Sequence, residues 1–176
     1  MLIAFTPACS LILGTDNSVD TKSHRYTVLR LDREKSQEWQ RLQTEDPDRP
    51  LSEEGDMAFE HKKTGTIVSV NSVCGQTRET SLEELSKYLL LGLNTRGPIE
   101  TRELEVDSVK ALESTVEAAM LSRRPGSQAR QHPVRLKAVV LRKAACTYDL
   151  MYIARPDAFR KHLPVFETFL KGFHAD

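Results

Sequence analysis

The chain has 176 residues, a length typical of a single domain with one hydrophobic core. Hydrophobic residues make up 39 % of it and charged residues 28 %, which excludes an intrinsically disordered chain and a collagen-like fibre. Lys and Arg total 25, as do Asp and Glu, and aromatic residues make up only 6 %, so neither charge nor stacking surface points to nucleic acid as a partner.

The first fourteen residues, MLIAFTPACSLILG, carry no charge, and the polar run TDNSVDTKSH follows them. They are fewer than the roughly 20 apolar residues of a membrane-spanning helix. A bacterial lipoprotein signal ends in a small residue followed by the cysteine that receives the lipid, and Ala8-Cys9 resembles such an end, although it lacks a basic leader and a Leu three residues before the cysteine. We therefore expect residues 1–23 to be a truncated lipoprotein signal and tether, lipidated at Cys9. The alternative is an apolar arm that packs on the core.

The next part of the chain predicts three strands. Residues 24–31 are rich in Tyr, Thr, Val and Leu and are predicted as the first strand. Residues 57–61 and 66–73 are predicted as two further strands, and the short connection between them favours a hairpin. Alternation along the last of these strands turns Cys74 toward the core. The charge-rich stretch that precedes the hairpin is predicted as loop with one short helix around Trp39.

The clearest helix signal lies at residues 81–91. Ser81 and Glu84 have the spacing of a capping box, and an apolar stripe follows on one face, formed by Leu82, Leu85 and Leu89. This pattern predicts a helix that covers one face of a sheet.

Beyond this helix, residues 99–106 are predicted as a strand, whereas residues 109–121 fit a helix or a strand. Residues 122–133 are typical of an exposed loop. Residues 134–142 and 146–154 are predicted as two antiparallel strands because the joint between them is short.

The end of the chain is predicted to be helical. Pro156 should open a short helical turn, and Pro164 should start the last helix, because proline suits a first helical position. An apolar stripe at helical spacing then faces the sheet, made by Phe166, Phe169, Leu170 and Phe173.

Three segments resemble PsbP-like proteins: the closing CTYDLMYIARPDAFRKHLPVFETFLKGF, the strand TIVSVNSVC and the helix SLEELSKYLLLGL that comes after it. The resemblance implies an α+β domain over residues 24–176, an αβα sandwich in which helices pack on a largely antiparallel sheet, and it makes residues 109–121 a strand. The family includes the extrinsic photosystem protein PsbP, a nuclear Ran-binding protein and many small bacterial exported proteins. It therefore implies no particular substrate or partner.

Three cysteines leave one over if the other two form a disulfide. If Cys9 carries a lipid, Cys74 and Cys146 remain, both at strand ends and both on predicted inward faces, and an oxidising periplasm permits a bridge between them. The alternatives are two buried reduced thiols, or a nucleophilic Cys74 activated by a histidine. The sequence leaves these alternatives open.

Basic residues gather in the segment 118–148, which contains no acid, whereas residues 32–60 are strongly acidic. The segment has two interpretations: a surface for an anionic partner such as phospholipid headgroups or an acidic protein, or a solvated hairpin whose bases protect a sheet edge. The bases are Arg123, Arg124, Arg130, Arg135, Lys137, Arg142 and Lys143.

The sequence contains no G-x-G-x-x-G, phosphate loop, H-E-x-x-H or C-x-x-C motif, and its five histidines are far apart along the chain. We therefore predict no cofactor, no metal and no catalysis. The expected protein is a lipoprotein of the bacterial cell envelope that faces the periplasm and acts as a binding or structural module for a protein or an anionic surface. The alternative is a cytoplasmic adaptor, a protein-binding domain whose N-terminus is an apolar arm.

Overall fold

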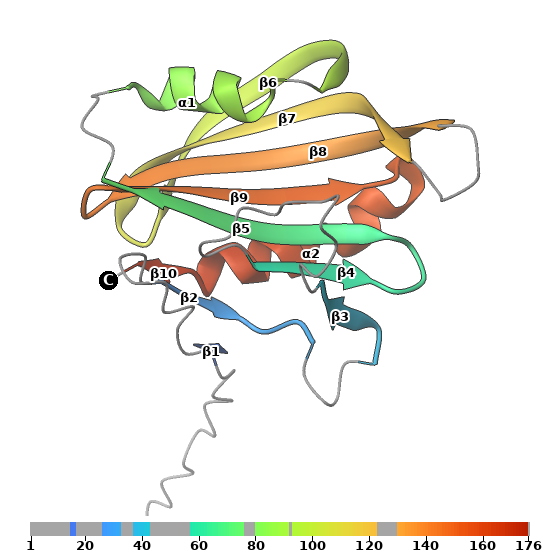
Figure 1. Ribbon diagram of the computed structural model, residues 1–176, viewed down its shortest axis with the longest axis horizontal. Coiled ribbons are helices and arrows are strands. Elements are labelled where there is room, and N and C mark those ends of the chain that lie inside the picture. The colour runs from blue at the N-terminus through green and yellow to red at the C-terminus, as the bar shows by residue number, and fades with distance from the viewer. Residues whose placement is uncertain are drawn as a thin grey trace, which may run out of the picture.

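A seven-stranded antiparallel sheet forms the centre of the fold, with one helix on each face (Figure 1). The computed structural model describes residues 15–16, 26–32, 37–42, 57–75, 80–91, 93–122 and 130–175. This α+β sandwich confirms the predicted fold class. From edge to edge the strands are β3 (Trp39–Arg41), β4 (Met57–His61), β5 (Thr66–Cys74), β9 (Cys146–Ala154), β8 (Arg130–Lys143), β7 (Val109–Ser122) and β6 (Asn94–Val106).

Tight hairpins set the register of this sheet. The β6–β7 turn places Asp107 and Ser108 at φ 51° and 62°, and the β8–β9 turn places Ala144 and Ala145 at φ 50° and 64°. A type I′ turn has positive φ at both of its central residues. It is favoured in tight hairpins because its twist matches that of the flanking strands. Residues 109–121 are thus a strand, as the resemblance predicts.

Helix α1 (Leu82–Leu89) packs on one face of the sheet, over β7 and β8. Its capping box is present: the backbone N–H of Glu84 donates to Ser81 Oγ at 3.2 Å, and the N–H of Ser81 donates to Glu84 Oε2 at 3.1 Å. At the interface the hydroxyls of Ser86 and Ser114 lie 2.6 Å apart. The predicted helix and its start are confirmed.

Helix α2 (Pro156–Lys171) covers the other face, where the main hydrophobic core lies. The prediction of a short turn followed by a new helix at Pro164 is wrong, because Pro164 lies inside one continuous helix. A proline inside a helix removes one intrahelical hydrogen bond and its ring crowds the carbonyl four residues earlier, a cost of about 3 kcal/mol that packing must offset. Burial of Phe159 before it and of Phe166 and Phe169 after it holds both halves of the helix on the sheet.

A small second sheet joins β2 (Tyr26–Leu29) with β1 (Thr15–Asp16) and β10 (His174–Ala175). β2 also contacts α2. Tyr26 packs against Tyr148 and Phe173, with ring centroids 6.1 and 6.0 Å away, so this sheet adds to the same core.

Two further predictions differ from the structure. Trp39 begins the edge strand β3 rather than a helix, because the segment pairs with β4 and buries the indole. β8 begins at Arg130, inside the predicted loop 122–133, because pairing with β7 continues to that residue. Within the described segments, no helix is long and apolar enough to cross a membrane.

Candidate functional site

A groove runs beside α2, over the part of the sheet formed by β6, β7 and β8. One cavity in it has a volume of about 470 Å³ and is lined by four bases, two acids and two apolar side chains from α2. A second cavity of about 500 Å³ continues along the helix toward the β6–β7 turn. The two share Arg102 and Glu113 in their linings, so they form one groove. The bases of the first cavity are Arg102, Arg135, Lys137 and Arg160, the acids Glu100 and Glu113, and the apolar residues Phe159 and Leu163.

Strand alternation explains why charged side chains from three strands meet here. Glu113 lies opposite Arg102 on β6, while Thr115 lies opposite Lys137 on β8, and alternate residues of a strand share a face. Farther along the same strands this face is apolar, and it carries Val139 and the rest of the core beneath α2. The charged residues therefore occupy the stretch of the α2 face where the core ends.

Glu113 is the buried centre of the groove. Its Oε1 accepts hydrogen bonds from Lys137 Nζ and Arg102 Nε, each at 2.6 Å, and its Oε2 accepts one from the Arg102 guanidinium at 3.1 Å. The side chain of Glu113 is 4 % exposed and that of Lys137 is 12 % exposed. Burial alone would raise the pKa of the Glu113 carboxyl, but the hydrogen bonds from Arg102 and Lys137 outweigh it and hold that pKa below its usual value. The carboxyl is therefore ionised at neutral pH.

Arg135 lines the same cavity. It forms no ion pair in the described structure, although its register partner on β7 is Glu117 and both residues line an adjoining cavity. Its guanidinium carbon lies 4.9 Å from the centre of the Phe159 ring, a cation–π contact that fixes the side chain on the helix. Its Nε is buried and has no hydrogen-bond acceptor among the residues that the structure describes. A buried donor without an acceptor is costly, so an anion that reached it would be stabilised.

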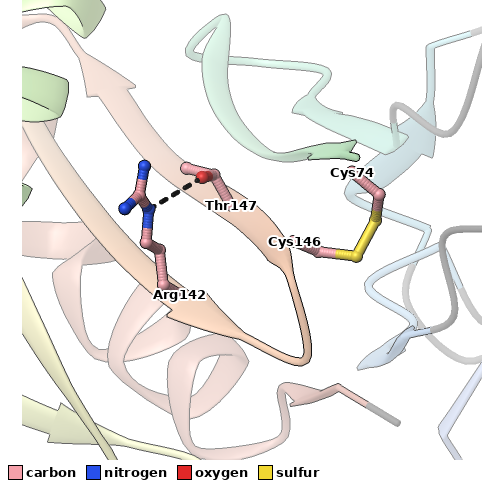
Figure 2. Close-up of a disulfide and its surroundings, with 4 residues drawn as sticks. All are labelled: Cys74, Arg142, Cys146 and Thr147. Carbon is pink, nitrogen blue, oxygen red and sulfur yellow. Dashed lines mark hydrogen bonds between the residues drawn. A yellow bond between two sulfur atoms is a disulfide. The ribbon is translucent and has the colours of Figure 1, made fainter. Parts of the chain in front are cut away.

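The predicted basic surface is divided by the sheet. Arg135 and Lys137 lie in the groove, whereas Arg142 is on the α1 face, where its Nε donates to Thr147 Oγ1 at 3.4 Å (Figure 2). Lys143 donates to Asp107 at 2.6 Å. The side chains of Arg123, Arg124 and Arg130 lie outside the described residues.

Asp107 closes the far end of the groove. Besides Lys143, its carboxylate accepts hydrogen bonds from the backbone N–H of Ala175 at 2.8 Å and from His174 Nδ1. Burial would raise the pKa of Asp107, but these three donors outweigh it and lower that pKa. The interactions tie the β6–β7 turn to β10.

Cys74 and Cys146 form a disulfide that joins the end of β5 to the start of β9 (Figure 2). The two residues are register partners in the sheet. Of the three alternatives for these cysteines the structure has the bridge, which leaves Cys74 no thiolate for nucleophilic chemistry. Disulfides persist in oxidising compartments, so this one indicates an extracytoplasmic protein. Cys9 lies outside the described residues.

The structure brings together two histidines that are 101 positions apart in the sequence. The rings of His61 and His162 are buried with centroids 4.3 Å apart, and the indole of Trp39 packs edge-on against both. Burial, and then the nearby His61 and Lys161, lower the pKa of His162. No three potential metal ligands of the His, Cys, Asp and Glu types gather anywhere in the described part of the chain.

Sequence reasoning missed Glu113 and Arg102, because each lies in a mixed-charge stretch that is typical of a surface strand. The tight turn at residues 107–108 is the sequence signal that could have predicted their pairing. Two turn residues at 107–108 place Val106 opposite Val109, and counting outward from that pair places Arg102 opposite Glu113.

No protein-family model matches the sequence, and no curated protein matches it either. Solved structures do. Cyanobacterial PsbP (CyanoP) from Synechocystis sp. PCC 6803 superposes with a TM-score of 0.51 at 13 % identity, over 93 % of this chain and 99 % of that one. LpqN, which is involved in cell envelope biogenesis of Mycobacterium tuberculosis, superposes with a TM-score of 0.53 at 11 % identity, over 92 % of this chain and 89 % of that one. The predicted resemblance to PsbP-like proteins is thus confirmed at the level of the fold.

Proposed function

We propose that the protein is a non-catalytic component of the bacterial cell envelope that binds an anionic partner in the groove beside α2. One observation carries this proposal: Arg102, Arg135, Lys137 and Arg160 converge on one cavity that holds only two acids. An excess of positive charge inside a concave, partly desolvated site attracts an anion more strongly than the same charges spread over a flat surface.

The state of the groove's carboxylate supports binding rather than catalysis. Glu113 is ionised and shared between two cations, and a carboxyl with a lowered pKa is a weak general base and has no proton to donate near neutral pH. What the groove offers instead is an array of N–H donors held in place by Glu113 and Phe159.

The envelope location rests on two supports. The disulfide indicates an oxidising compartment, which argues against the alternative of a cytoplasmic adaptor. The solved structure of LpqN, a protein involved in cell envelope biogenesis, shares the fold. We further propose that lipidation of Cys9 attaches the domain to the membrane, facing the periplasm. Thr15 and Asp16 pair with β2, so these two residues belong to the domain rather than to the predicted tether.

Binding in the groove is tested by isothermal titration calorimetry of the full chain with octyl sulfate and with neutral octyl glucoside. The short alkyl chain of the probes suits the apolar residues of the lining. We expect octyl sulfate to bind and octyl glucoside not to bind, and Arg135→Gln to weaken the former about tenfold, the loss of one charge-assisted contact. The matched control is Lys110→Gln, which removes an exposed base on the neighbouring strand β7 that pairs with Glu103 and does not line the cavity. Equal heats for the two probes, or equal losses in both variants, would contradict the proposal.

The anchor has a separate test. Metabolic labelling with palmitate should mark the wild-type protein and not Cys9→Ala. If the wild type takes up no label, or if the variant keeps it, the proposed lipid anchor at Cys9 is wrong. The proposal that the groove binds an anion would still stand.

A further inference from the structure

We infer that the ligand of the groove is a phosphate monoester with an apolar tail, its phosphate among the bases of the first cavity and its tail along the second. This inference rests on the proposed function and names the chemical class of the anion. The phosphate would lie between Arg102, Arg135 and Arg160, and the tail would extend toward Leu104 and Leu170.

The charge of the first cavity matches a dianion. Four bases and two acids line it, which leaves an excess of two positive charges. Glu113 neutralises only one of the two bases that it contacts. A phosphate monoester carries a charge of about −1.5 to −2 at neutral pH, whereas a carboxylate, a sulfate ester or a phosphodiester carries −1. Among these anions the monoester matches the charge of the first cavity most closely.

The donors that remain in the cavity outnumber what a carboxylate can use. Arg102 contacts Glu113 through Nε and one terminal nitrogen, so its other N–H groups are left for a ligand. Lys137 directs one hydrogen bond to Glu113 and has two further protons on Nζ. Arg135 adds a guanidinium that forms no ion pair in the described structure, and Thr115 adds a hydroxyl. The three terminal oxygens of a phosphate monoester can accept from donors on several sides at once.

The groove has room for an organic group on the phosphate. The first cavity alone, at about 470 Å³, is within the range of pockets that hold drug-sized molecules and is far larger than one phosphate ion. Apolar atoms continue from Phe159 and Leu163 in the first cavity to Leu104 and Leu170 in the second. A short alkyl or acyl chain could lie along this row of apolar side chains.

The second cavity sets the direction of the ligand. Its lining contains four acids but only two Lys or Arg residues, so it repels the phosphate that the first cavity attracts. The acids are Glu105, Asp107, Glu113 and Glu167. The anionic end therefore belongs near Arg135 and the uncharged end near the β6–β7 turn.

The test compares octyl phosphate with octyl sulfate, which has the same tail and the same tetrahedral head but a single charge, by calorimetry on the full chain. We expect octyl phosphate to bind about tenfold more tightly near pH 8, and this preference to vanish near pH 5, where the monoester has lost its second charge at a pKa of about 6. Arg135→Gln and the α2 surface variant Arg160→Gln should each remove most of the preference, and Lys110→Gln should keep it. Unchanged fluorescence of the buried Trp39 shows that each variant is folded.

Several results would overturn the inference. Octyl sulfate that binds as tightly as octyl phosphate, or a preference that does not change with pH, would exclude the dianion and leave the proposed anion-binding function standing. Failure of both anions to bind would remove that function as well. Glycerol 3-phosphate that binds as tightly as octyl phosphate would exclude the tail.

Two further measurements distinguish a lipid headgroup from a soluble ester as the natural source of the monoester. Sedimentation with phosphatidylcholine vesicles that contain phosphatidic acid, but not with phosphatidylcholine alone, would identify a lipid headgroup. Binding of octyl phosphate without vesicle binding would identify a soluble ester. Both outcomes support the inferred chemistry.

Discussion

Removal of the disulfide between Cys74 and Cys146 should lower the free energy of unfolding by about 4 kcal/mol. The bond closes a loop across 72 positions, and the loop-entropy argument assigns such a loop about 15 cal/mol/K, or about 4.4 kcal/mol at 25 °C. The native sheet does not depend on the bond, because eight register pairs from Ile67↔Ile153 to Cys74↔Cys146 hold β5 on β9. The effect should therefore act through the unfolded chain, which gains freedom when the bond is absent.

Urea unfolding of the oxidised wild type and of the double variant Cys74→Ala/Cys146→Ala provides the measurement. Trp39, the single tryptophan, is buried in β3 at the opposite edge of the fold from β6 and reports loss of the core. The midpoint of thermal unfolding should fall by roughly 8 to 16 °C for a chain of this size, and reduced wild type should match the variant. A difference in unfolding free energy below about 1 kcal/mol would refute the loop-entropy reasoning for this protein.

Three further predictions concern single residues. Glu113→Gln should lower the free energy of unfolding by about 3 to 5 kcal/mol, measured in urea, because it leaves the buried Lys137 ammonium without a full counter-charge, while the exposed Glu105→Gln should change it by less than about 0.5 kcal/mol. Because the pKa of His162 is lowered in the folded state, the unfolded chain takes up the proton first. Stability should be complete above pH 6.5 and decline as the pH falls toward the lowered pKa, and His162→Phe should flatten that decline in urea titrations between about pH 7.5 and about pH 5. Ala145→Gly should raise the thermal midpoint through about 1 kcal/mol of relieved backbone strain at φ 64°, and a lower midpoint would contradict this account of the turn.

Elements specified by local patterns were predictable from the sequence. The capping box of Ser81 and Glu84 fixes the start of α1, and alternation fixes which residues of β5 and β9 face the core. Elements specified by distant partners were not. β3 has three residues and no pattern of its own, and it exists because it pairs with β4. Pro164 remains inside α2 because phenylalanines on both sides of it bury against the sheet.

The basic segment shows the same limit at the level of the site. Period-two alternation along β8 separates Arg135 and Lys137 on one face from Arg142 on the other, a division that the predicted basic surface did not include. Alternation could not show that α2 leaves this stretch of β6, β7 and β8 uncovered. It also could not show that the Phe159 ring of α2 would pack against the Arg135 guanidinium. The groove is a product of helix packing, and packing is not encoded in the spacing of charged residues.

The buried carboxylate of Glu113 stabilises the cations that converge on the groove. The four cations that line one partly desolvated cavity repel one another and lose hydration, a cost that the fold must offset. Glu113 offsets it for Arg102 and Lys137 by accepting three hydrogen bonds, and Phe159 offsets part of it for Arg135 through its ring. Because one negative charge serves two cations, the cavity keeps a net positive charge with its donors already oriented. Glu113 therefore stabilises the groove and orients two of its donors, so its replacement should lower the free energy of unfolding and release Arg102 and Lys137 from their present positions.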